Sequence, residues 1–176
     1  ILKAANVFQK REENLPPFPL TKTFIVEDFF FSSTILGRAF KISKNLEYIE
    51  MLVSFLLKAN LQQKNGLFWH SRNAHFYWGR GNGFAAIGLA EALTFIPKNH
   101  SSYPQLIKMF QKLMKGMLKS QDFEGMWHQV SNVQGSYSET TSTCMMGFAL
   151  SRGLLMKWIS GNIFENALSK AWEATN

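Results

Sequence analysis

The sequence has a single cysteine, Cys144, among its 176 residues, so it cannot hold an internal disulfide. It has no apolar run near the ~20 residues that a membrane-spanning helix needs, which excludes an integral membrane protein. Charged residues make up 18% of the chain and apolar residues 46%, a balance typical of a globular protein. The chain begins at Ile1 without a basic-then-apolar leader, so a targeting segment would be absent, removed or not included, and the sequence leaves the compartment open.

Long blocks of like charge are also missing. The net charge is +7, but no five or six basic residues follow one another. A basic balance can indicate nucleic acid, an anionic membrane or an acidic substrate as a partner. Because the lysines and arginines are scattered, we expect a solvated, Lys-rich surface, with neither nucleic acid nor a membrane as a partner.

Strand signals are absent as well, because no sustained period-two alternation occurs and no Asn-Gly turn separates apolar runs. Helical spacing prevails instead, after a possible helix tail over residues 1–11 and a proline-rich break at 12–19. Ser43 and Asn162 are candidate helix caps, and Pro104 falls in a first helical turn. Helices are predicted over residues 26–41, 45–60, 83–95, 101–120, 139–159 and 163–174.

Two loops rich in glycine, histidine and aromatic residues interrupt the helices, over residues 61–82 and 121–136. Gly66-Leu-Phe-Trp-His70 and Gly125-Met-Trp-His128 share a character and lie 59 residues apart. Such a period fits stacked helical hairpins, so both loops are expected at the same end of the hairpins. Two copies are few, and chance resemblance is the alternative.

The segment from Trp78 to Phe84 combines three glycines, an arginine and two aromatic rings. Glycines let the backbone approach a ligand closely, and Arg80 is a planar donor suited to a carboxylate. Its glycine spacing does not fit a dinucleotide loop, and no strand precedes it. A glycine-rich turn with a surface arginine is the plain alternative, and the residues alone leave both open.

Glu27 and Asp28 place two carboxylates at a predicted helix start. There their negative charge interacts favourably with the helix dipole. The functional alternative is a general acid whose pKa is raised by its apolar neighbours. His70, His75 and His128 lack the spacing of a metal motif, so no metal site is predicted. Cys144 lies on an apolar helical face and is expected to be buried and inert.

Three ordered blocks resemble the unsaturated rhamnogalacturonyl hydrolases and unsaturated glucuronyl hydrolases, glycoside hydrolase families 105 and 88. Residues 27–39 are similar to the family's Asp-Asp-Leu-Phe-Met helix. His70 followed by residues 78–84 resembles its Trp-x-Arg-Gly-Asn-x-Trp block. Residues 125–129 and 136–140 resemble its Gly-Leu-Trp-His and Ser-Tyr-x-Glu-Thr segments.

The resemblance implies an all-α fold, part of an (α/α)6 toroid of which this chain supplies about three helical hairpins. Residues 1–176 would then be a fragment of a single glycoside hydrolase domain, truncated before Ile1 and, by a shorter piece, after Asn176. It also implies a reaction in which a carboxylic acid protonates the C4=C5 double bond of a terminal unsaturated uronate. Water then adds at C5, and the neighbouring sugar is released without a metal or organic cofactor.

The family's functional residues can be carried over one by one. Glu27 takes the place of the catalytic Asp, and its extra methylene would displace the acid by about an ångström, so Asp28 or loss of activity are alternatives. Phe84 replaces a Trp and keeps a stacking face. Substrate-binding residues implied by the resemblance and the loops are His70, Trp78, Arg80, Asn82, Phe84, Trp127 and His128.

The leading hypothesis is a hydrolase of unsaturated uronyl-terminated oligosaccharides, with unsaturated rhamnogalacturonan disaccharide as the expected substrate. One alternative is a catalytically impaired, sugar-binding relative, and another is a helical-repeat module that binds a partner. The choice between galacturonyl and glucuronyl ends, the leaving sugar and the oligomeric state stay open.

Overall fold

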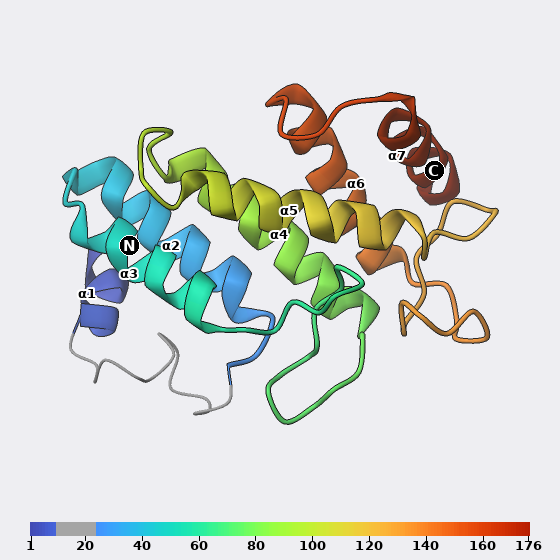
Figure 1. The fold of residues 1–176 in the computed structure, drawn as a ribbon, viewed down its shortest axis with the longest axis horizontal. Helices are drawn as coiled ribbons and strands as arrows, with labels where there is room; N and C mark the ends of the chain where they lie inside the picture. The colour runs from blue at the N-terminus through green and yellow to red at the C-terminus, as the bar shows by residue number, and fades with distance from the viewer. Residues whose placement is uncertain (10–23) are drawn as a thin grey trace.

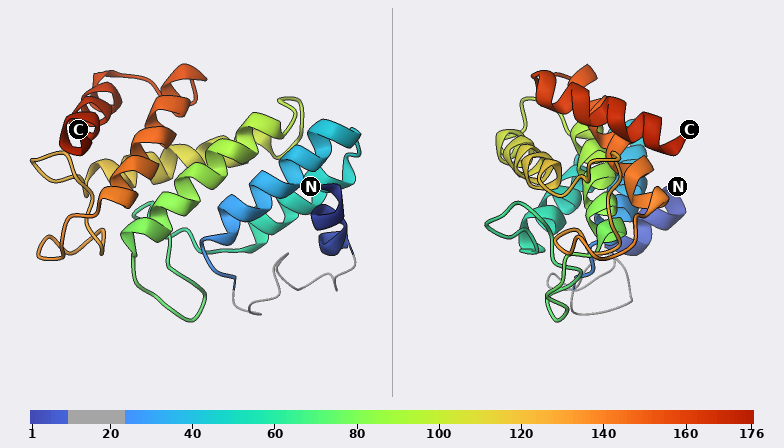
Figure 2. Two further views of the ribbon diagram at one scale, coloured as in Figure 1. Left: turned by 180° about the vertical axis from the view of Figure 1, so that it is seen from behind. Right: turned by 90° about the vertical axis from the view of Figure 1, so that its right-hand side faces the viewer.

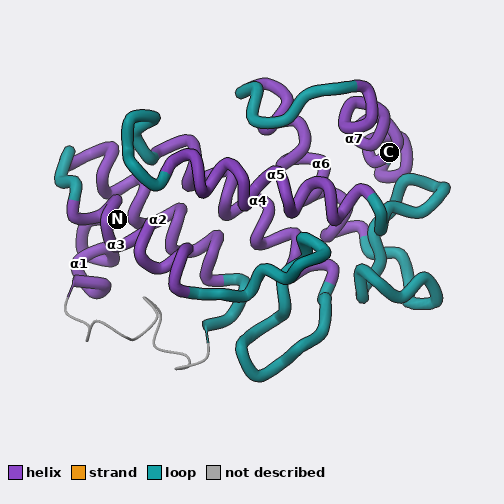
Figure 3. The backbone as a smooth tube through the Cα atoms, viewed as in Figure 1, coloured by secondary structure: helices purple, strands orange, loops and turns teal. Residues whose placement is uncertain are grey.

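The computed structural model describes residues 1–9 and 24–176, so the proline-rich break predicted at 12–19 lies outside the described residues. The described part contains helices and no strands, which confirms the predicted all-α class (Figures 1 and 3). Its helices are α1 Leu2–Gln9, α2 Asp28–Ser43, α3 Glu47–Lys58, α4 Gly79–Phe95, α5 Tyr103–Leu118, α6 Thr140–Leu155 and α7 Asn162–Thr175.

Most helix ends fall within a few residues of their predicted places, and the differences have local causes. The predicted helix at 139–159 ends four residues early, at Leu155, and Lys157 then takes a positive φ of 58°. Ser43 does not cap α3: the carbonyl oxygen of Asn45's side chain accepts the N–H of Glu47 instead. Gly161, with φ 110°, precedes α7, so Asn162 is its first residue rather than its cap.

Three helices form an inner row, in which α4 packs between α2 and α6 (Figures 1 and 2). Each inner helix also packs against the helix that follows it, α3, α5 or α7, and the chain therefore contains three helical hairpins. No helix within residues 1–9 and 24–176 is long and apolar enough to cross a membrane.

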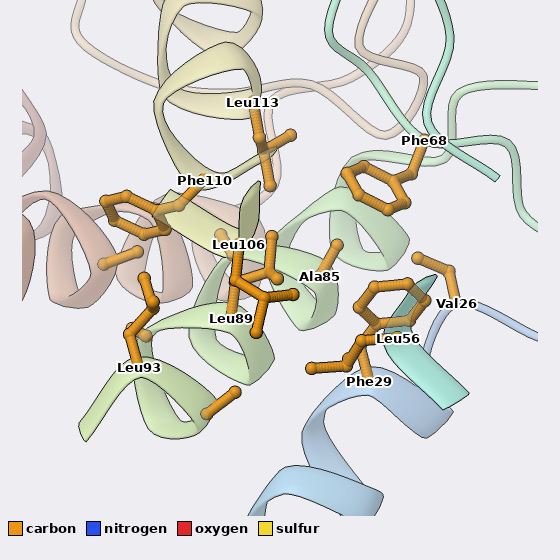
Figure 4. Packing of buried hydrophobic residues seen from close by; sticks show 14 of the residues in the cluster. Val26, Phe29, Leu56, Phe68, Ala85, Leu89, Leu93, Leu106, Phe110 and Leu113 are labelled. Carbon is orange, nitrogen blue, oxygen red and sulfur yellow. The ribbon is translucent and has the colours of Figure 1, made fainter. Parts of the chain in front are cut away.

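The core lies between these layers, where Phe29, Leu89 and Phe110 are fully buried among the side chains drawn in Figure 4. The carboxylate of Glu91 links the three inner helices at the end far from the long loops. Glu91 of α4 accepts a 2.8 Å hydrogen bond from Arg38 of α2 and lies 4.0 Å from the guanidinium of Arg152 in α6.

Helix α4 is buried on nearly every side, which suits its central place in the row. Small residues allow this close approach. A Cβ added at Gly88 would lie 2.5 Å from the backbone carbonyl carbon of Phe29 in α2, so the two helices meet backbone to backbone.

Gly88→Ala is therefore expected to lower the free energy of unfolding by about 1–3 kcal/mol, the usual cost of overpacking, although alanine favours helix. Denaturant unfolding would measure the change. Gly135→Ala is the matched control, because an added Cβ there meets nothing within 4 Å. Equal stability of the two variants would contradict the close packing of α2 on α4.

Candidate active site

The 59-residue repeat is a structural repeat. In the first loop, the side-chain amide of Gln62 donates to the carbonyl of Gly66 at 3.0 Å and to a carbonyl of α5 at 2.9 Å. In the second, Gln121 donates to Gly125 and to a carbonyl of α7, both at 2.9 Å. The two glycines have φ of 95° and 96°, a region that favours glycine. Each loop is thus fixed in the same way on the outer helix of its hairpin.

A buried aromatic side chain lies under each loop, Phe68 in the first and Trp127 in the second. The Phe68 N–H donates to the side-chain oxygen of Asn82 at 2.8 Å, and the Asn82 amide donates to the carbonyls of Phe68 and Trp78. The Trp127 indole donates to the Met117 carbonyl at 2.8 Å. The sequence predicts that Asn82 and Trp127 bind substrate. In the structure both side chains are fully buried and hydrogen-bond to the loop and helix backbone.

The inner helices begin at the same end of the molecule as the two long loops (Figure 2). Backbone hydrogen bonds tie each start to a loop: Val26 to His70 before α2, Gly79 of α4 to Gln129, and Glu139 before α6 to Trp127. The unpaired N–H groups at helix N-termini favour anions. This end of the molecule is thus suited to a negatively charged ligand.

Arg80 lies in the first turn of α4 and is held from two sides. Its Nη1 donates to Oε1 of Glu139, the residue before α6, at 2.6 Å. Its guanidinium carbon lies 4.6 Å from the centroid of the Trp78 ring. The Arg80 side chain keeps 38% of its surface exposed, whereas Glu139 keeps 7%, so the arginine can still bind a second, external acceptor.

Glu27 lies beside His70, whose ring contacts the same indole. Oε2 of Glu27 is 3.7 Å from Nδ1 of His70, too far for a hydrogen bond. The His70 ring stacks on Phe76 and meets the Trp78 ring edge-on, both with centroids 5.3 Å apart. Glu27, His70, Trp78, Arg80 and Glu139 therefore form one continuous line of contacts.

Phe84 and Asp28 border this line. Phe84 is one turn beyond Arg80 in α4 and contacts the rings of Phe30 and Phe31 in α2, at centroid distances of 6.2 and 5.9 Å. Asp28 is the first residue of α2 and only 3% exposed. The Glu27 side chain keeps 19% of its surface exposed, so it is the more accessible of the two adjacent carboxylates.

Buried polar atoms without a hydrogen-bond partner among the described residues gather at this end. Such atoms are uncommon in folded proteins, and each needs a physical explanation. A ligand with several hydroxyl groups and a carboxylate offers partners for them. Those at the loop end belong to Glu27, His70, Trp78, His128, Gln129, Ser131, Glu139 and Ser142, and the others to Ser32, Ser33 and Thr34 of α2.

His128 is oriented by a carboxylate that sequence reasoning missed. Its Nε2 lies 2.8 Å from Oδ2 of Asp122, and Ser138 donates to the same oxygen at 3.4 Å. Burial alone would raise the pKa of Asp122, but hydrogen bonds from His128 and from the Met126 backbone N–H outweigh it and lower the pKa. The second loop is thus held by an ionised Asp122.

Asp122→Asn should lower stability near neutral pH, with an effect that fades in acid. A carboxylate whose pKa is lowered by folding stabilises the fold above its unfolded pKa of about 4 and loses this contribution as pH falls through the folded value. Thermal unfolding of the unmutated protein and the variant between pH 3 and 7 would test it. A difference in melting temperature that grows below pH 4 would contradict the assignment.

The described residues contain no group of three or more His, Cys, Asp or Glu side chains that could hold a metal ion. Cys144 is exposed, contrary to the expected burial. It lines a hollow of about 680 Å³ between α6 and α7 together with Phe148 and Trp172, on a face that no described residue covers.

Residues 26–175 match the family model described as Glycosyl Hydrolase Family 88. The unsaturated rhamnogalacturonyl hydrolase YesR of Bacillus subtilis is 32% identical over 74 residues, 42% of this chain and 22% of that protein.

Solved structures share the fold. A possible member of the GH105 family from Salmonella enterica superposes with a TM-score of 0.87 at 19% identity, over 98% of this chain and 51% of that one. The unsaturated glucuronyl hydrolase of Bacillus sp. GL1 gives 0.73 at 16% identity, over 99% and 53%. The predicted helical-toroid fold is confirmed, and the chain spans about half the length of these structures.

Proposed function

Because the chain belongs to glycosyl hydrolase family 88, we propose that it forms part of a hydrolase that removes an unsaturated uronyl residue from the end of an oligosaccharide. The observation that carries the proposal is the continuous line from Glu27 through His70 and Trp78 to the Arg80–Glu139 pair. It provides a carboxyl group, a stacking face and a carboxylate-binding arginine side by side, at the N-termini of three helices.

In the proposed reaction Arg80 binds the uronate carboxylate, and the Trp78 ring supports the guanidinium. The Glu27 carboxyl gives its proton to C4 of the double bond, which leaves positive charge shared between C5 and the ring oxygen. Water adds to C5 and returns a proton to Glu27. The hemiketal then opens, the bond from C1 to the neighbouring sugar breaks, and that sugar leaves with its oxygen protonated.

The substrate we propose is unsaturated rhamnogalacturonan disaccharide. Support comes from the 32% identity with YesR, whose name states that activity. Glucuronyl-ended substrates are the second candidate, since the fold is shared with an unsaturated glucuronyl hydrolase. Both have the conjugated carboxylate that the site requires.

Following the ultraviolet absorbance of the conjugated double bond tests the proposal. The complete protein should remove the absorbance of the galacturonyl-ended disaccharide, and it should hydrolyse a glucuronyl-ended one more slowly. Absence of turnover on both would rule out the hydrolase. Saturable binding without turnover would instead identify an impaired, sugar-binding relative, in which the longer Glu27 misplaces its proton.

A further inference from the structure

The outer face of α5 carries a stripe of lysines at intervals of four, three and four residues, a spacing that places them on one side of a helix. All of them are exposed. Residues 92–121 contain no Asp or Glu, and no acidic side chain of the described residues forms an ion pair with the stripe. The stripe consists of Lys108, Lys112, Lys115 and Lys119.

The first long loop adds a fifth lysine beside this stripe. Gln62 anchors the loop on α5, and an added Cβ at Gly116 would lie 2.7 Å from the Asn65 carbonyl, so loop and helix are in direct contact. Lys64 is held there together with Asn65. The five lysines, Asn65 and Gln111 line a shallow hollow of about 320 Å³, which we term the lysine surface.

The second repeat shows that the fold does not require these charges. Its loop is anchored on α7 through the equivalent glutamine and glycine. The positions equivalent to Lys64, Lys108, Lys112 and Lys115 are occupied there by Phe123, Asn166, Lys170 and Glu173. Only one of the four is basic, so the same architecture forms without a concentration of positive charge.

We propose that the lysine surface binds a linear acidic polysaccharide that carries uronate carboxylates along its length, and that the unsaturated end of such a chain is the substrate of the candidate active site. The proposal rests on the proposed function, because such a chain is the source of the terminal uronate. Lysines act as point charges for successive carboxylates, and the amides of Asn65 and Gln111 can bond to hydroxyl groups. The stripe spans about 16 Å along the helix, enough for several sugar units.

Other polyanions fit this surface less well. Single-stranded nucleic-acid sites combine a basic groove with aromatic rings on which bases stack, and no aromatic residue lines the lysine surface. A peripheral membrane site would add apolar side chains that enter the lipid, and none lines the hollow.

The test compares two variants of the complete protein, each lacking four positive charges. The first replaces Lys108, Lys112, Lys115 and Lys119 with Gln. The charge-matched control replaces Lys41, Lys58, Lys98 and Lys170, which are exposed elsewhere. Binding of saturated polygalacturonate would be measured by calorimetry at low salt, together with turnover of the unsaturated disaccharide.

We expect the first variant to bind polygalacturonate about tenfold more weakly or worse, with turnover within about twofold of the unmutated protein, and the control to bind nearly as the unmutated protein does. Equal weakening of both variants, or unchanged binding of the first, would overturn the proposal. So would a loss confined to duplex DNA or to phosphatidylserine vesicles. Failure of the proposed function would show separately, as absent disaccharide turnover in the unmutated protein.

Discussion

Glu27→Gln is expected to lower kcat on the unsaturated disaccharide by about 10²- to 10⁴-fold, the usual worth of a positioned general acid, with little change in KM. Glutamine keeps the size of the side chain but has no acidic proton to give to C4. The structure favours this residue because Oε2 of Glu27 is buried, has no hydrogen-bond partner among the described residues, and lies beside His70. Initial rates of absorbance loss, measured over a range of substrate concentrations, would separate kcat from KM.

Two neighbouring variants make this result interpretable. Glu27→Asp shortens the acid to the residue that the resembling family has here and should keep measurable activity. Asp28→Asn should reduce stability more than kcat, since Asp28 is only 3% exposed at the first turn of α2. If Asp28→Asn abolished activity and Glu27→Gln kept it, the general acid would be Asp28 and not Glu27.

Local periodicity was sufficient to predict the helices, and the family resemblance supplied the expectation of about three hairpins. The spacing of apolar residues repeats within each helix and depends little on distant contacts. The segments that begin at Gly66 and Gly125 were also sufficient to predict the repeat of the two loops. The positive φ of each glycine is a local requirement of the turn that places each loop on an outer helix.

The same patterns do not predict which side chains are buried by contacts between distant segments. Asn82 and Trp127 have the chemistry of ligand contacts, but whether a side chain faces a ligand or a loop backbone depends on segments far away in sequence. The apolar face that contains Cys144 predicts burial only if another element covers it, and none of the described ones does. Lysines that look scattered in sequence form the lysine surface once α5 and the first loop are placed together.

Glu139 shows the same limit within the site. It lies 59 residues from Arg80 and was visible only as one letter of a resembling block, without a role. The structure gives it one: it accepts a 2.6 Å hydrogen bond that fixes one edge of the guanidinium while Trp78 supports its face. Glu139 is thus a positioning residue in our proposal, and Arg80 is the residue that contacts the substrate.

Arg80→Lys is expected to raise KM for the unsaturated disaccharide by about ten- to a hundredfold, with a smaller change in kcat. Lysine keeps the charge but loses the planar fork that can bind a carboxylate and Glu139 together, and a hydrogen bond to a charged group contributes about 1.5–3 kcal/mol. Lysine is preferred to alanine here because removing the charge would leave Glu139 buried and unpaired, at a cost in stability.

Glu139→Gln should produce a weaker form of the same defect, since glutamine can still accept the hydrogen bond but leaves the arginine less firmly held. The matched control is Arg152→Ala, an arginine of α6 that contacts Thr94 and Glu91 at the opposite end of the inner helices. Its KM should stay within about twofold of the unmutated value, even if its melting temperature falls. If Arg152→Ala and Arg80→Lys raise KM alike, general loosening of the fold explains both, and Arg80 does not bind the uronate.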